Sequence, residues 1–245
     1  MELYPSLTLY ERTEPFELQV GRGLIEGHSL VNIQGYNAAQ SSTFRAVWEQ
    51  SNTFDFVYPA AAVAMEFTSA VAENFVMRVD GLDANYAIKT AIVTFTNSTT
   101  GVVTTGTNLF YRINAMQIIS GTALDTPRAT NGGITYSEIA AGSGRSQASI
   151  YTVPLGYTFY LTRAQAFSTN NGNQFCTYRV YSQTINAGIV TPNTVLTAPF
   201  TQSYSSTRIV PRAYPEKTDI QWQLAQSTSA PGSIQVEGIL IKNTV

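Results

Sequence analysis

Few residues in this sequence have the types and spacing of a catalytic site. His28 is the only histidine and Cys176 the only cysteine, so a Ser-His-Asp triad, a Cys-His dyad or a zinc site would have to use them. His28 lies in the turn-like Gly27–Ser29, and no Gly-x-Ser-x-Gly motif accompanies it. Cys176 lies in the strand-like run Phe175–Val180, where a cysteine is usually a small buried hydrophobe. We therefore expect no catalytic residue, no cofactor and no bound metal.

The carboxylates offer two close pairs. Asp80 with Asp83, and Glu216 with Asp219, are the acids that glycoside hydrolysis would need if they faced one groove. Together with Asp125, the first pair could also surround calcium, but the spacing of an EF-hand loop is missing. Acids at strand ends more often form turns, and this is the interpretation we favour.

Glycines and aromatic residues suggest binding roles that the patterns do not favour. Gly21–Gly27 lacks the Gly-Lys-Ser/Thr ending of a phosphate loop and is more typical of chance or of a bulged strand. Trp222 lies in the apolar phase of a strand, which predicts a core position, whereas Trp48 fits a core or a sugar platform equally well. The Tyr- and Asn-rich segments Tyr178–Thr184 and Ser203–Thr207 are expected to be loops, and they fit sugar stacking and protein–protein contact equally well.

Composition indicates a globular protein with a weakly charged surface. Charged residues make up 12% of the 245 residues, against about 25% in an average domain, and Ser, Thr, Asn and Gln supply the polarity. The net charge is -2 and the basic residues are scattered, so nucleic acid is not expected as a direct partner. We see neither a signal peptide nor an apolar run of membrane-spanning length, which predicts a protein made in the cytoplasm.

Short β-branched runs that alternate in polarity dominate the chain and predict an all-β fold. In Ile220–Leu224 apolar and amide side chains alternate strictly, as in a strand with one buried face. Turns are expected at Gly81–Asn85 and Asn97–Gly101. The segment Ser41–Gln50 fits a helix or a strand. Further strands are predicted at 76–80, 88–96, 109–119, 150–153, 157–162, 175–182, 209–210 and 234–241.

These elements suggest two β-sandwich, jelly-roll-like domains behind an extended N-terminal arm. The arm covers residues 1–15, and it is either disordered or adds a strand to another subunit. A first β-sandwich domain is predicted from residue 16 to 120, with period-two patterning that starts at Phe16. A linker at 121–136 precedes a jelly-roll-like domain at 137–245.

Several segments resemble a group of virion structural proteins from marine and freshwater tailed phages. These proteins begin with a similar "RGL..G.......GYN" stretch, and the likeness extends over nearly the whole chain after the arm. The matching segments are Gly21–Asn37, Val79–Tyr86, Tyr151–Thr158, Pro215–Ile220 and Val236–Ile241. The resemblance implies a particle component built from β domains, and it carries no catalytic residue.

Together these observations predict a non-enzymatic structural protein located in a phage virion. A capsid decoration or cement protein on the head is favoured, bound through contacts with the major capsid protein. Neck and tail components remain alternatives, including a receptor- or glycan-binding module of a tail fibre, and a depolymerising enzyme is the least favoured reading. We expect the chain to form a homo-oligomer, with a trimer as the first guess.

Overall fold

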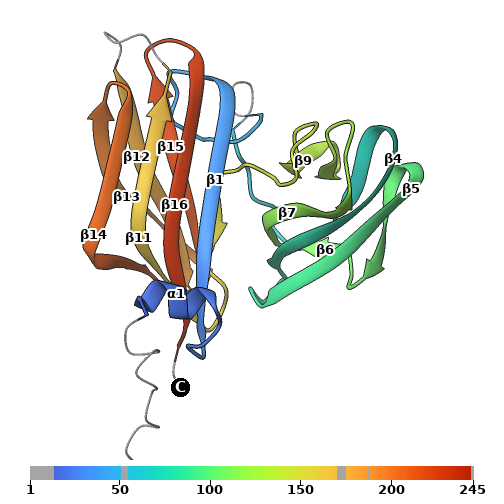
Figure 1. Cartoon of the computed structure of the whole chain (residues 1–245), viewed down its shortest axis with the longest axis horizontal. Coiled ribbons are helices and arrows are strands. Elements are labelled where there is room, and N and C mark those ends of the chain that lie inside the picture. The colour runs from blue at the N-terminus through green and yellow to red at the C-terminus, as the bar shows by residue number, and fades with distance from the viewer. Residues whose placement is uncertain (1–13, 51–54, 170–174, 187, 244–245) are drawn as a thin grey trace, which may run out of the picture.

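The chain forms a β-sandwich that carries a smaller β lobe. The computed structural model describes residues 14–50, 55–169, 175–186 and 188–243, which contain sixteen strands and one short helix. The sandwich and the lobe lie side by side (Figure 1). The predicted all-β class is confirmed. The predicted arm, apart from Glu14 and Pro15, lies outside the described residues.

Eight strands form the two four-stranded sheets of the sandwich, and the first of them is separated from the others by the lobe. These strands are β1 (His28–Gln40), β10 (Ile150–Thr152), β11 (Tyr157–Ser168), β12 (Cys176–Asn186), β13 (Ile189–Phe200), β14 (Ser203–Tyr214), β15 (Thr218–Gln226) and β16 (Ala230–Lys242). Sheet A has the order β1-β16-β11-β14, and sheet B has the order β10-β15-β12-β13. Every ladder within them is antiparallel.

The pairing of these eight strands is that of a jelly roll. Taken in chain order, the first strand pairs with the eighth, the second with the seventh, the third with the sixth and the fourth with the fifth. A long hairpin ribbon folded over on itself gives this nesting and two four-stranded sheets. The jelly-roll prediction is therefore confirmed for this part of the chain, with β1 added to it.

The inserted lobe contains the seven strands between β2 and β10. The short β2 (Arg45–Ala46) still belongs to the sandwich, because it pairs with β15. The lobe strands are β3 (Val63–Ala64), β4 (Glu66–Leu82), β5 (Ile88–Thr105), β6 (Leu109–Phe110), β7 (Arg112–Gly121), β8 (Arg128–Asn131) and β9 (Ile134–Glu138). The order of its main sheet is β5-β4-β8-β9, β7 also pairs with β4, and β3 pairs with β6.

This topology corrects the predicted domain boundaries. Residues 28–40, assigned to the first domain, form β1 and pair with β16 at the other end of the chain. Residues 128–131 and 134–138 overlap the predicted linker at 121–136, yet they are strands of the lobe. Spacing along the sequence could not show either point, because strand pairing joins segments that are far apart in the chain.

Two local predictions need correction, at Phe16–Gly21 and Asn97–Gly101, and the choice left open for Ser41–Gln50 is resolved. A helix, α1 (Phe16–Gly21), begins after Pro15 where a strand period was expected, since proline is well placed just before a first helical turn. The segment Ser41–Gln50 holds β2 and a bridge from Trp48 to Ala148, and no helix. Asn97–Gly101, expected to be a turn, lies within the long strand β5.

Alternating side chains build two separate cores. In the sandwich, Trp222 and Leu224 of β15 are fully buried and pack with Phe159 and Tyr178, which face them from other strands. The lobe has its own core, where the rings of Phe75 and Phe95 stack with centroids 4.5 Å apart. Each part thus buries an apolar face of its own, as an independent sheet structure requires.

A tight stem connects the lobe to the sandwich. We use this name for Val47–Trp48 and Ala148–Ser149, where the chain enters and leaves the lobe. The Ser149 N–H donates to the Val47 carbonyl at 2.8 Å, and the Ser149 hydroxyl donates to the Trp222 carbonyl at 2.6 Å. A Cβ at Gly35 of β1 would lie 2.3 Å from the Val47 carbonyl oxygen and 2.8 Å from the Ser149 nitrogen. Only glycine lets β1 pass this close to the stem.

Substituting Gly35 tests this close approach. We expect Gly35→Ala to lower the free energy of unfolding by about 1–3 kcal/mol, because backbone atoms rather than flexible side chains would have to move. Thermal and urea unfolding measure the loss. Gly144→Ala is the matched control, since a Cβ there meets nothing within 4 Å. Equal stability of the two variants would contradict the role given to Gly35.

Candidate functional site

The acids considered for catalysis form bonds with their own neighbours. Asp80 accepts hydrogen bonds from Arg78 Nε and Thr90 Oγ1, both at 2.8 Å. Asp83 accepts the backbone N–H groups of Asn85 and Ala87 at 2.8 and 2.9 Å, as a turn-forming acid does. The first candidate pair is therefore divided between a surface ion pair and a turn.

The second pair is separated in the same way. Glu216 accepts the N–H of Gly156 at 2.6 Å, whereas Asp219 is buried in an ion pair with Arg112. Asp125, proposed for calcium, accepts the N–H of Ala70 at 2.8 Å. The expectation that these acids serve the fold agrees with each of these contacts.

The remaining candidates occupy structural positions. His28 Nδ1 lies 2.8 Å from the Glu26 carbonyl oxygen, and its ring packs edge-on against Phe16. Cys176 and Trp222 are fully buried, as predicted. Trp48, which the sequence left open, is also buried, so it provides no sugar platform. Within the described ranges, no three His, Cys, Asp or Glu side chains gather as metal ligands would.

Three segments that were considered for binding differ from their predicted conformations. Gly21–Gly27 contains the end of α1 and the turns that follow it, rather than a bulged strand, because Gly23 and Gly27 have positive φ angles. Tyr178–Thr184 lies inside β12 and Ser203–Thr207 inside β14, so neither is a loop. No helix in the described part of the chain is long and apolar enough to cross a membrane.

A buried ion pair joins the lobe to the sandwich. Arg112 of β7 donates from Nε and Nη2 to the two carboxylate oxygens of Asp219 on β15, both at 2.9 Å. The side chains are only 4% and 3% exposed. Arg112 Nη1 donates to the carbonyls of Pro59 and Tyr111, and Thr152 Oγ1 donates to Asp219 at 2.6 Å. Burial lowers the pKa of Arg112, but bonding to Asp219 outweighs this effect and raises it above its ordinary value.

Aromatic rings enclose the guanidinium group of Arg112. Its central carbon lies 4.0 Å from the ring centroid of Tyr111 and 4.7 Å from that of Tyr58, which is within cation–π range. Tyr86 completes the enclosure at 5.8 Å, and burial raises the pKa of its hydroxyl above the ordinary value. Sequence patterns could not predict this cluster, because its members are scattered along the chain.

Three of the segments singled out in the sequence analysis lie next to the Arg112–Asp219 ion pair. The N–H of Leu155 donates to the carbonyl of Tyr86 at 2.9 Å, and the N–H of Lys217 donates to the carbonyl of Val153 at 2.9 Å. These bonds connect Val79–Tyr86, Tyr151–Thr158 and Pro215–Ile220. These three segments thus contribute backbone hydrogen bonds at the junction between the lobe and the sandwich.

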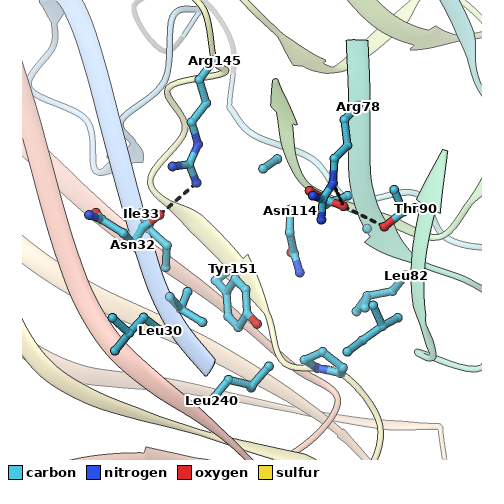
Figure 2. Close-up of a pocket in the computed structure, with 16 residues that line it drawn as sticks. Leu30, Asn32, Ile33, Arg78, Leu82, Thr90, Asn114, Arg145, Tyr151 and Leu240 are labelled. Carbon is cyan, nitrogen blue, oxygen red and sulfur yellow. Dashed lines mark hydrogen bonds and ion pairs between the residues drawn. The ribbon is translucent and has the colours of Figure 1, made fainter. Parts of the chain in front are cut away.

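A cleft of about 300 Å³ opens between β1 and the lobe (Figure 2). Leu30, Ile33 and Leu240 line its sandwich side, and Arg78 with Asp80 lies on the lobe side. The N–H of Lys242 donates to the carbonyl of Gly27, so odd-numbered residues of β1 form the hydrogen-bonded pairs with β16. The carbonyls of the even-numbered residues therefore point away from β16. Arg145 Nη2 fills one such position with a 2.9 Å bond to the Asn32 carbonyl. Asp80 is the only carboxylate among the described lining residues, so the cleft lacks an acid pair.

The opposite side of the sandwich exposes apolar residues on its two edge strands. Ile209 and Val210 of β14 are 101% and 80% exposed, and Ile189 of β13 is 69% exposed. The ladder between β11 and β14 is interrupted after Thr207 and resumes at Arg212, so Arg208–Pro211 bulges from the edge. We call Arg208–Pro211 the β14 bulge.

This side also lacks acidic residues. From residue 139 to 215 the sequence contains no Asp, Glu or Lys, and its only charged residues are Arg145, Arg163, Arg179, Arg208 and Arg212. All of β10–β14 falls within this stretch. This uneven distribution of acids can be read directly from the sequence, but the net charge of -2 does not reveal it.

Glu49 lies beside the stem, close to a second carboxylate. The N–H of Ala140 donates to Glu49 Oε1 at 3.3 Å, while Glu138 accepts bonds from Arg128 and Gln50. Burial, and to a smaller extent the charge of Glu138, raises the pKa of Glu49 from 4.5 to about 7. The folded state therefore holds a proton on Glu49 at pH values where the unfolded chain has lost it.

Comparison with known proteins identifies no family. No family model and no curated protein matches the chain. Among solved structures, chains from infectious bursal disease virus, strains Gx and Gt, give TM-scores of 0.22 and 0.19 at 10% and 11% identity. The matches cover 90% and 93% of this chain, and 78% and 77% of the others. TM-scores this low do not establish a shared fold, and nothing about the role of this chain follows from them.

The buried ion pair predicts a large loss of stability when it is broken. Arg112→Ala leaves Asp219 buried without its partner, so the free energy of unfolding should fall by about 3–5 kcal/mol. Arg78→Ala removes an ion pair whose arginine side chain is 50% exposed, and it should cost less than about 1 kcal/mol. Urea denaturation of both variants measures the difference. Similar losses in the two would show that Arg112 has no special role.

Glu49 predicts a pH dependence of stability. Its folded pKa is higher than its unfolded pKa, so the stabilising contribution of Glu49 is fully present below about pH 4.5 and is lost as the pH rises to about 7. The loss attributable to this group is about 3 kcal/mol, at about 1.4 kcal/mol per pKa unit. Glu49→Gln should flatten the curve in this window and stabilise the protein at pH 8. Urea denaturation from pH 4 to 8 checks this, and an unchanged slope in the variant would contradict it.

Proposed function

We propose that this chain is a non-enzymatic structural protein of a tailed-phage virion, and specifically a decoration or cement protein of the head. The observation that carries the proposal is the exposed, acid-free side of the sandwich around the β14 bulge. Fully exposed aliphatic side chains on the edge of a well-packed domain mark a surface that another protein covers. The bulge and Pro211 also prevent uncontrolled pairing at this edge, so a specific partner is favoured.

Two further observations support this role. Three of the segments that resemble phage virion proteins, Val79–Tyr86, Tyr151–Thr158 and Pro215–Ile220, meet at the junction of lobe and sandwich, so this part of the likeness concerns the architecture of the particle component. The four acids considered for hydrolysis are also engaged in turns and ion pairs, which counts against a depolymerase that uses these residues. The partners in this proposal are the major capsid protein and further copies of the chain, and the place of action is the virion, assembled in the host cytoplasm.

A neck or tail position is the alternative, and the copy number of the chain in the virion distinguishes it from a position on the head. A shell protein is present in hundreds of copies, whereas a component of a single vertex is present in about 6, 12 or 18 copies under ring symmetry. We expect quantitative gels and cryo-electron microscopy of purified virions to show hundreds of copies over the shell. A count of 6, 12 or 18 at one vertex would contradict the decoration role.

The double variant Ile209→Asp/Val210→Asp tests the surface itself. Virions produced with it should carry the chain at no more than about a tenth of the wild-type copy number, because buried charges would oppose the contact. Val102→Asp on β5 is the matched control, since Val102 is 64% exposed and lies on the lobe. Normal incorporation of the double variant would assign the contact to another surface.

A further inference from the structure

The outer face of sheet A carries two aromatic side chains at the end remote from α1. Tyr36 of β1 and Phe167 of β11 both pair with Ser233 of β16. One row across the sheet therefore consists of two aromatic rings with a serine hydroxyl between them. Tyr36 is 40% exposed and Phe167 is 42% exposed. Neighbouring strands are about 4.8 Å apart, so the two backbones lie about 10 Å apart with a small residue between them.

Amide side chains form the next row. Gln34 and Gln165 both pair with Gln235 of β16, and all three belong to the outward-facing phase of their strands. Two hollows of about 330 and 210 Å³ meet at the Tyr36–Ser233–Phe167 row. We call the two hollows together the sheet A groove.

The sheet A groove is uncharged. Among the described residues that line it there is no Asp, Glu, Lys, Arg or His. The row beyond the glutamines holds Arg163 and Glu237, whose side chains form an ion pair at 3.8 Å, and Arg145 lines an adjoining hollow. An ionic ligand would find no counter-charge here, whereas an uncharged ligand with many hydroxyl groups would find donors and acceptors.

We propose that the sheet A groove binds a neutral oligosaccharide. The faces of Tyr36 and Phe167 provide apolar stacking surfaces for the C–H faces of two sugar rings. The amides of Gln34 and Gln235, which line the groove, both donate and accept, and so match sugar hydroxyls, which do the same. An extended peptide would be recognised mainly by adding to a free strand edge, but β16 has partners on both sides at this position.

This activity goes beyond the proposed assembly role and uses a different surface. Assembly was assigned to the edge around the β14 bulge, and the sheet A groove lies on the face of the sheet. A particle protein with both surfaces would hold the shell at its edge and present its face to glycans outside. The two functions can therefore fail separately.

A glycan array tests the proposal with the full-length chain. We expect hits among neutral oligosaccharides and no preference for sialylated or sulfated ones. Titration calorimetry with the best neutral oligosaccharide should show at least tenfold weaker binding for Tyr36→Ala and for Phe167→Ala. Phe175→Ala is the matched control, because Phe175 is 68% exposed but lies outside the groove, and it should bind as the wild type does.

Thermal unfolding of each variant confirms that it is folded, since both rings are exposed and contribute little to the core. An array without any neutral hit above the level of Tyr36→Ala/Phe167→Ala would overturn the proposal. Unchanged affinity in that double variant, or a preference for acidic glycans, would do the same. Copy numbers in virions made with this double variant should equal those of the wild type. Loss of incorporation would show that the face serves assembly instead.

Discussion

The bidentate pair of Arg112 and Asp219 determines how the two parts of this protein lie against each other. Removing two charges from water costs several kcal/mol for each ion, and the cost is offset only when nearly every donor and acceptor is matched. Here three guanidinium nitrogens and both carboxylate oxygens are bonded, and tyrosine rings close the remaining sides. Small displacements of β7 relative to β15 would break several of these contacts at once. The cleft and the stem therefore keep a defined geometry.

Much of the local structure could be predicted from side-chain alternation. The strict pattern in Ile220–Leu224 placed Trp222 in the core, and Cys176 is buried for the same reason. Asp83 forms a turn because a short carboxylate reaches the N–H groups that follow it. Each of these features depends on residues that are close together in the sequence, so the pattern alone contains the information.

Long-range pairing explains what the sequence did not show. The hydrogen bond from the Gln40 side chain to the Leu224 carbonyl spans 184 residues, and no spacing rule connects such positions. Boundaries drawn between neighbouring segments therefore missed the insertion of the lobe. The sheet A groove was not predicted for a related reason, because Tyr36 and Phe167 become neighbours only through β16. Their outward phase was visible in each strand, but which strands lie side by side was not.

The insertion also has a consequence for the order in which the protein forms. The lobe is one continuous segment between Trp48 and Ala148, so all of its strands leave the ribosome well before β16. The sandwich cannot close until β16 has been synthesised, because β16 is the strand that β1 pairs with in the described part of the chain. Domains that are complete early fold early, and pairing over long separations is slow. During synthesis, therefore, the lobe can already be compact while the strand edge of β1 is still unpaired, so the solubility of β1 in that interval depends on how quickly β16 is translated.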